Sequence, residues 1–106
     1  MRQSNIIVLL FLALAFSACS RQEKDVREIH RVLKSQVDLW NKGDLEGYML
    51  GYWNSENLIF TGSKGINRGW QQTLGWYKQS YPDKQAMGEL SFNDLDVQLI
   101  SSESAF

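Results

Sequence analysis

The stretch Trp40–Trp53, WNKGDLEGYMLGYW, contains a helix end, a helix start and a cluster of aromatic side chains. Asn41-Lys42-Gly43 is typical of a helix end, because a cation lies in the last turn and a glycine that can adopt the left-handed conformation follows it. Asp44 is then the predicted N-cap, whose carboxylate accepts backbone N–H groups at the start of the next helix. Glu46 adds favourable charge near that terminus. We therefore expect a sharp turn at Gly43, with two helices packing across the corner.

The helix after this corner is predicted to be amphipathic. Its apolar residues recur at spacings of three and four, which is the period of one helical face: Leu45, Tyr48, Met49 and Tyr52. Gly47 and Gly51 lie one turn apart on another side, and each costs about 1 kcal/mol relative to alanine in a helix interior. Either another element packs closely against these glycines, or the helix is short and irregular.

The helix before the corner is expected to run from about residue 26 to Trp40 or Asn41. It carries one apolar stripe, formed by Val26, Ile29, Leu33, Val37 and Trp40. The charged residues on its other faces have mixed signs and indicate a solvated surface rather than a binding patch: Arg27, Glu28, Arg31, Lys34 and Asp38. His30 lies beside the stripe, where an exposed or half-buried position is favoured over a catalytic base.

A hairpin and a third helix are predicted after the corner. Residues 58–61 form a short strand, 62–65 a turn and 66–68 a returning strand. The turn lacks the spacing of a phosphate-binding loop. The third helix opens at Gly69 and runs to about Tyr81, where the following Pro82 ends it. Its apolar face comprises Trp70, Leu74, Tyr77 and Tyr81.

The last part of the chain alternates like a strand. The pattern covers Met87 to Ile100 and slips by one residue at Asn93-Asp94, which predicts a long strand with a β-bulge. Residues 101–104 are then a turn, and Ala105-Phe106 the start of another strand. Such a long strand would present an open apolar edge, so we expect the chain to be a truncated form of a larger domain.

Composition limits the classes of function. A chain of 106 residues with 11 basic and 12 acidic side chains is one domain at most, without the basic footprint of a nucleic-acid-binding protein. The single Cys and single His exclude a disulfide within the chain and a metal site built from several such ligands. We expect no metal, no cofactor and no nucleic-acid partner.

The N-terminus has the pattern of a targeting segment. Arg2 precedes an apolar run from Ile6 to Phe16, which is too short to span a bilayer but suits a signal peptide. The sequence Phe16-Ser17-Ala18-Cys19 resembles a bacterial lipobox, although Phe16 departs from the usual leucine. The alternative is an ordinary signal peptide cleaved after Ala18, which leaves a free thiol.

The lipobox resemblance implies an organisation for the whole chain. Residues 1–18 are the signal peptide, 19–25 a tether lipidated at Cys19, and 26–106 an incomplete domain. The expected location is the bacterial cell envelope, on the periplasmic side, with the membrane as a partner through the lipid anchor. Ser20 after the cysteine favours the outer membrane.

The order of elements resembles the first two-thirds of the nuclear transport factor two-like (SnoaL-like) fold. The stretches that carry the resemblance are Trp40–Glu46, Leu58–Gly62, Gly69-Trp70, Tyr81–Asp83 and Met87–Phe92. The resemblance implies an α+β fold of order helix-helix-hairpin-helix-strand. In it a cone-like curved antiparallel sheet wraps a long N-terminal helix, and here the last strands would be missing. Proteins of this class include ketosteroid isomerase, scytalone dehydratase and binding modules, and many are homodimers.

The resemblance also implies a pocket at the mouth of the cone. The predicted lining is Trp40, Tyr48, Trp53, Phe60, Arg68, Trp70 and Tyr77, although simple core packing explains each aromatic equally well. Arg68 could meet an anionic ligand at the pocket mouth, but a surface arginine is the favoured reading. The hydroxyls of Tyr48, Tyr52 and Tyr77 suit a carbonyl ligand, but such tyrosines more often bury their rings and bond a backbone group.

Three functions follow from this reading, in order of preference. The first is an envelope-anchored domain that binds a small apolar or aromatic molecule. The second is a cofactor-free isomerase, dehydratase or hydrolase, which requires a buried carboxylate or histidine with a raised pKa; no catalytic residue is matched, since Asp44 is better explained as an N-cap. The third is a structural or dimerisation module without a ligand.

Overall fold

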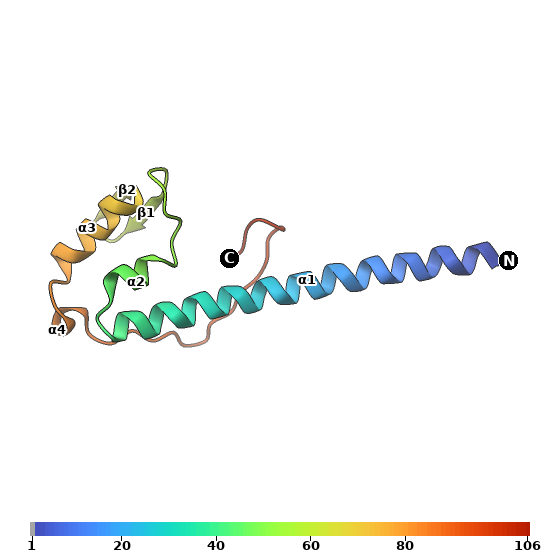
Figure 1. Ribbon diagram of the computed structural model, residues 1–106, viewed down its shortest axis with the longest axis horizontal. Helices are drawn as coiled ribbons and strands as arrows, with labels where there is room; N and C mark the ends of the chain where they lie inside the picture. The colour runs from blue at the N-terminus through green and yellow to red at the C-terminus, as the bar shows by residue number, and fades with distance from the viewer. Residues whose placement is uncertain (1) are drawn as a thin grey trace. The chain divides into compact units, whose positions relative to one another are not determined.

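The computed structural model describes the backbone of residues 2–106 and the side chains of residues 20–106. It has two compact units, Met1–Arg31 with Leu95–Phe106, and Val32–Asp94. The elements, in chain order, are α1 (Arg2–Asn41), α2 (Leu45–Met49), β1 (Ile59–Gly62), β2 (Gly65–Arg68), α3 (Trp70–Ser80) and α4 (Lys84–Met87) (Figure 1). The mixture of helices and a small antiparallel sheet is the predicted α+β class.

Helix α1 begins earlier than predicted. Residues 20–25, expected to form a tether, are helical and continue into the predicted helix without a break. The local reason is composition, because no glycine or proline interrupts residues 20–41. The signal peptide and Cys19 lie outside the residues whose side chains are described. Among the described residues, no helix combines the length and the hydropathy that a bilayer crossing requires.

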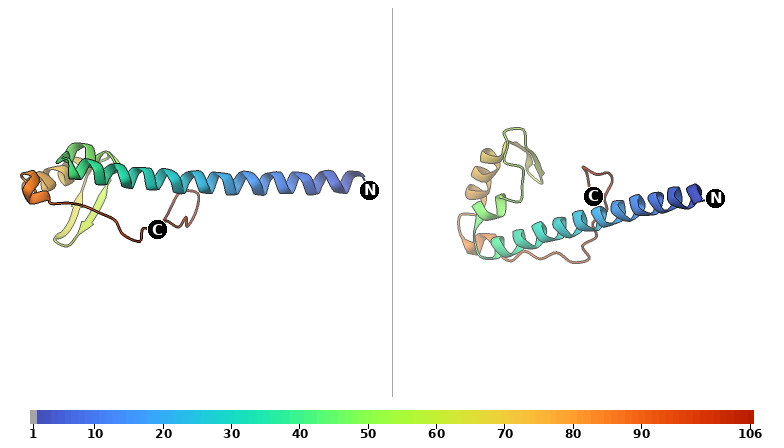
Figure 2. Two further views of the ribbon diagram at one scale, coloured as in Figure 1. Left: turned by 90° about the horizontal axis from the view of Figure 1, so that it is seen from below. Right: turned by 45° about the vertical axis from the view of Figure 1, so that its right-hand side comes forward.

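The corner between α1 and α2 forms as predicted. Gly43 has a φ of 80°, in the left-handed region, and the Asp44 carboxylate accepts the backbone N–H of Gly47 at 2.9 Å. Both explanations offered for Gly47 and Gly51, a short helix and close packing against another element, are correct. Helix α2 has only five residues, and a side chain at Gly51 would collide with Gln36 of α1. Helix α2 consequently lies between the C-terminal end of α1 and α3 (Figures 1 and 2).

The predicted hairpin is confirmed. Strands β1 and β2 are antiparallel, with Ile59 opposite Arg68 and Gly62 opposite Gly65. Phe60 turns towards the core, whereas Ile59 and Ile66 are exposed. The third helix is also confirmed: Gly69, with a φ of 92°, precedes α3.

The long strand predicted over residues 87–100 is wrong. Met87 ends the short helix α4 and is buried, and no strand covers residues 88–98. A strand requires a partner for its backbone groups, and the β1–β2 hairpin is not paired with this segment. The β-bulge predicted at Asn93-Asp94 is therefore also wrong, because no strand is present there; Asp94 instead has a φ of 54°, in the left-handed region. The predicted turn at residues 101–104 also forms, since the Ile100 N–H donates to the Ser104 carbonyl at 2.8 Å.

The core of the second unit consists of buried side chains from α1, α2, α3 and α4: Trp40, Met49, Trp70, Leu74, Tyr77 and Met87. Two indole N–H groups fix it to backbone carbonyls. Trp40 donates to Met87 at 3.1 Å, and Trp70 donates to Met49 at 2.7 Å. These bonds satisfy carbonyls that would otherwise be costly to bury.

The side chain of Asn41 pairs with the backbone of the segment that follows α4. Its side-chain amide donates to the Leu90 carbonyl at 3.0 Å, and its side-chain oxygen accepts the Leu90 N–H at 2.7 Å. The amide therefore pairs with Leu90 as a neighbouring strand would.

Replacing Asn41 with alanine is expected to lower the free energy of unfolding by about 2 kcal/mol, because both half-buried backbone groups of Leu90 lose their partner. Urea denaturation measures the loss, and hydrogen exchange at the Leu90 amide should become faster. The matched control is Asn57→Ala, whose side chain is exposed and which should change stability by less than about 0.5 kcal/mol. Unchanged exchange at Leu90 in Asn41→Ala would contradict the assigned role.

Candidate ligand-binding site

Seven aromatic rings gather in the unit Val32–Asp94. We call them the aromatic cluster: Trp40, Tyr48, Tyr52, Phe60, Trp76, Tyr77 and Tyr81. They come from the end of α1, from α2 and the turn after it, from β1, and from α3 with its C-cap. Residues distant in sequence therefore meet at one place only because the chain turns at Gly43 and again at the hairpin.

Tyr77 is the centre of the aromatic cluster. Its ring centroid lies between 5.0 and 5.9 Å from those of five neighbours: Trp40, Tyr48, Phe60, Trp76 and Tyr81. Four of these contacts are edge-to-face and the one with Tyr81 is stacked. Both are the arrangements that aromatic quadrupoles favour.

The aromatic cluster has a buried part and a half-buried part. Trp40 and Tyr77 are buried and belong to the core. The other rings keep part of their surface in contact with solvent: Tyr48, Tyr52, Phe60, Trp76 and Tyr81. Half-buried aromatic surface held by a rigid core is suited to contact with an apolar or aromatic molecule.

Three tyrosines supply polar groups to this apolar surface. The Tyr48 and Tyr52 hydroxyls are hydrogen-bonded at 3.2 Å. Burial raises the pKa of Tyr48 and of Tyr77 to about 12, and it raises the pKa of Tyr52 further above its ordinary value. Hydrogen bonds and electrostatic interactions among these tyrosines also shift the three pKa values. All three hydroxyls therefore keep their protons at neutral pH and can donate hydrogen bonds.

The predicted pocket residues do not all meet in the aromatic cluster. Trp40, Tyr48, Phe60 and Tyr77 belong to the aromatic cluster.

Arg68 and Trp70 line a different cavity of about 440 Å³ at the start of α3. Its other lining is mostly polar, from residues 54–56 and 69–72. Trp53 is 63% exposed and is not one of the rings of the cluster.

Three cluster members were not among the predicted pocket-lining residues: Tyr52, Trp76 and Tyr81. The sequence indicated Tyr52 only as a hydroxyl donor to a carbonyl ligand. The helical period predicts Tyr81 on the apolar face of the third helix, and this face contributes to the cluster. Trp76 is adjacent to Tyr77 and lies off that face, and no local signal indicates it. Its contacts with Phe60, Tyr77 and Tyr81, at centroid distances of 6.2, 5.0 and 6.4 Å, bring it into the cluster.

Acid–base and metal-binding groups do not converge in the described part of the chain. Among residues 20–106 no Asp, Glu or His is buried, and His30 is exposed as predicted. Within the same residues, no group of three His, Cys, Asp or Glu side chains is close enough to hold a metal ion. Asp44 serves as the N-cap.

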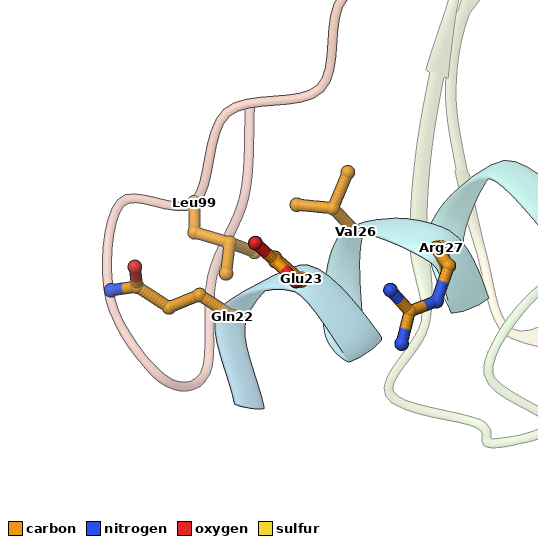
Figure 3. A pocket seen from close by; sticks show the side chains of 5 residues that line it. All are labelled: Gln22, Glu23, Val26, Arg27 and Leu99. Atoms are coloured by element: carbon orange, nitrogen blue, oxygen red, sulfur yellow. The ribbon is translucent and has the colours of Figure 1, made fainter. Parts of the chain in front are cut away.

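A second concave surface lies in the other unit, on α1. It has a volume of about 550 Å³ and is lined by Gln22, Glu23, Val26, Arg27 and Leu99 (Figure 3). This groove is open and carries charged side chains at its rim. None of the predicted pocket residues lines it.

Comparison with known proteins supports the fold. An NTF-2 like protein of unknown function from Shewanella oneidensis MR-1, solved as a crystal structure, is 40% identical in sequence, with a TM-score of 0.67. The match covers 73% of this chain and 64% of that chain, so this chain spans less than two thirds of the length of the solved protein. No protein-family model and no curated protein matches.

The chain therefore has the NTF2-like α+β fold, and the resemblance inferred from the helix corner and the order of elements is confirmed at the level of the fold.

Proposed function

We propose that this NTF2-like chain is an envelope-anchored domain that binds a small apolar or aromatic molecule carrying a carbonyl oxygen. The observation that carries the proposal is the half-buried aromatic cluster with the Tyr48 and Tyr52 hydroxyls 3.2 Å apart within it. The rings supply apolar contact area, and the protonated phenols supply hydrogen bonds to an acceptor.

The chemistry of the cluster favours a neutral ligand. Among residues 20–106 no Asp, Glu, Lys or Arg side chain is buried, so no buried charge is present to pair with a charged ligand. Transfer of a charged group to such a surface carries a large desolvation cost without a compensating partner. A planar ketone or aldehyde satisfies both the apolar rings and the hydroxyl donors.

The anchoring part of the proposal is supported by sequence. Arg2, the apolar run Ile6–Phe16 and the single cysteine at the lipobox-like position are the features of a bacterial lipoprotein signal. A lipidated Cys19 would hold the domain at a membrane of the cell envelope. The intact mass of protein extracted from a native membrane fraction tests this part, since cleavage before Cys19 with added acyl chains is the expected result.

The enzymatic alternative receives no specific support from the described residues. It requires a buried carboxylate or histidine beside the ligand, and the buried polar side chains in residues 20–106 are Gln36 and Thr73. Gln36 donates to the Tyr48 carbonyl at 3.2 Å, and Thr73 donates to the Gly69 carbonyl at 2.8 Å. Both are committed to backbone groups within the fold.

A matched pair of probes tests the binding site. We expect 1-acetonaphthone, an aromatic ketone, to bind about fivefold more tightly than 1-ethylnaphthalene, because one additional hydrogen bond contributes about 1 kcal/mol. Tyr52→Phe should remove this difference and leave the affinity for the hydrocarbon unchanged. Quenching of tryptophan fluorescence measures both affinities, since Trp40 and Trp76 lie in the cluster.

Tyr81→Phe is the control for the probe experiment. It removes a hydroxyl from the same cluster, but this hydroxyl is not part of the Tyr48–Tyr52 hydrogen bond. The ketone preference should survive in Tyr81→Phe. Equal affinity of the parent chain for the two probes would refute the role of the hydroxyls, and no quenching by either probe would refute the binding site.

A further inference from the structure

Cations recur on one side of α1 in the residues that follow Cys19. They are Arg21, Lys24, Arg27 and Arg31, at spacings of three, three and four. Residues at these spacings are neighbours on a helix surface. The alignment exists because residues 21–25 are helical rather than an irregular tether. The sequence alone indicated only a solvated surface of mixed charge for residues 27–38.

The opposite side of this helix segment is occupied. Val26 and Ile29 are half-buried, and each lines a concave surface together with Leu99 of the C-terminal segment. The four cations are exposed. In Figure 3 the Arg27 side chain extends away from the loop that carries Leu99. The cationic side of the segment is therefore available to a partner, with Arg27 at its edge also lining the groove that contains Leu99.

Acidic residues reduce this charge at one position. Glu28 pairs with Arg31, with a distance of 2.9 Å between Oε2 and Nε. Glu23 and Asp25 lie four residues from Arg27 and Arg21, so they border this row of cations on the helix surface, and Glu28 lies four residues from Lys24. None of these three carboxylates is at ion-pair distance from Arg21, Lys24 or Arg27 among the described side chains. We call Arg21, Lys24 and Arg27 the basic face.

We propose that the basic face binds the anionic headgroups of the membrane to which the chain is attached. The inference rests on the proposed anchoring at Cys19. At about 1.5 Å per residue, the three cations begin about 3 Å and end about 12 Å along the helix from Cys19. That range is comparable to the distance of about 8 Å over which salt screens charge, so a lipid surface at Cys19 attracts the basic face if α1 lies along it.

A lipid surface fits this face better than nucleic acid does. The chain as a whole has a formal net charge of −1, so the cations are a local feature rather than part of a general excess. Three charges along one helix edge match a planar array of anionic headgroups. Nucleic-acid-binding domains instead carry a strongly basic overall charge.

The test is a competition of the full chain, purified from membranes, between two populations of vesicles. One is pure phosphatidylcholine and the other contains about 30% phosphatidylglycerol, whose headgroup is anionic. Because the anchor inserts into both, its contribution cancels in the partition ratio. We expect the chain to favour the anionic vesicles by a factor of roughly 100 at low salt, since each Lys or Arg near such a surface contributes about a factor of five.

The triple variant Arg21→Gln, Lys24→Gln, Arg27→Gln should partition almost equally. The matched control removes the same amount of charge elsewhere, with Lys42→Gln, Lys64→Gln and Lys78→Gln, and should keep most of the preference. About 0.5 M salt should abolish the preference of the parent chain.

Equal partition of the parent chain, or equal losses in the two triple variants, would overturn the proposal. So would binding to a DNA duplex that the first variant loses, without any vesicle preference. Failure of the anchor is read separately, as release of the chain into the aqueous phase when only neutral vesicles are present. The preference for anionic vesicles is then measured on the released chain.

Discussion

Trp40→Ala is expected to lower the free energy of unfolding by about 4 kcal/mol, within the range for loss of a large buried aromatic side chain. Trp40 is 8% exposed, and its ring contacts Tyr48, Tyr77 and Tyr81 at centroid distances of 5.0, 5.8 and 5.1 Å. Its indole N–H also donates to the Met87 carbonyl. The substitution therefore removes apolar burial, three aromatic contacts and the partner of a buried carbonyl. Urea denaturation measures the change.

Trp53→Ala is the matched control, because the same substitution is made at a tryptophan that is 63% exposed. Its expected cost is below about 1 kcal/mol, as is usual for a surface position. Trp40→Phe separates the two contributions at the buried site. It keeps an aromatic ring and loses the N–H, so a cost of about 1–2 kcal/mol is expected for the unpaired carbonyl. Similar costs for Trp40→Ala and Trp53→Ala would show that the aromatic cluster is not the core.

Alkaline pH is expected to unfold the protein through the tyrosines of the aromatic cluster. Burial raises the pKa of Tyr48 and Tyr77 from 10.0 to about 12, and it raises that of Tyr52 as well. The folded protein consequently holds these protons more tightly than the unfolded chain does. Stability is fully present below about pH 10 and is lost as pH rises through about 12, because the unfolded state binds fewer protons in that window.

The expected loss is of order 2 kcal/mol for the buried Tyr77 and several kcal/mol for the three tyrosines together. This is comparable to the whole stability of a small domain. Urea denaturation at a series of pH values measures it, and absorbance of the tyrosinate near 295 nm follows ionisation directly.

A double variant shows whether the tyrosines of the aromatic cluster are responsible for this loss of stability. In Tyr48→Phe, Tyr52→Phe the decrease of stability between about pH 10 and 12 should be smaller than in the parent, because two of the linked protons are gone. If the parent and the double variant lose stability in parallel, the linkage lies elsewhere in the chain.

Local structure was predictable where a few residues decide it. The corner at Gly43-Asp44 depends on one left-handed glycine and one capping carboxylate, and both perform the predicted role. The hairpin turn before Gly65 and the apolar face of α3 likewise follow from nearby residues.

The long strand shows where such reasoning fails. The alternation of apolar and polar residues over positions 87–100 is typical of a β-strand. A strand forms, however, only if another segment pairs with its backbone. In the described chain Asn41 pairs with Leu90, and Met87 lies in a short helix beneath Trp40. Periodicity carries no information about these partners.

The sequence by itself determined the α+β class, the helix corner, the hairpin and several of the aromatic residues that meet. The corner, the hairpin turn and the apolar helix faces depend on residues that are close together in sequence, and those faces indicate which aromatic side chains are directed inwards. Only the tertiary structure decided that Tyr77 is the centre of the cluster, that Trp53 is outside it, and that Arg68 lines a separate cavity. Those outcomes depend on contacts between residues far apart in sequence, which are set by how whole elements pack against one another.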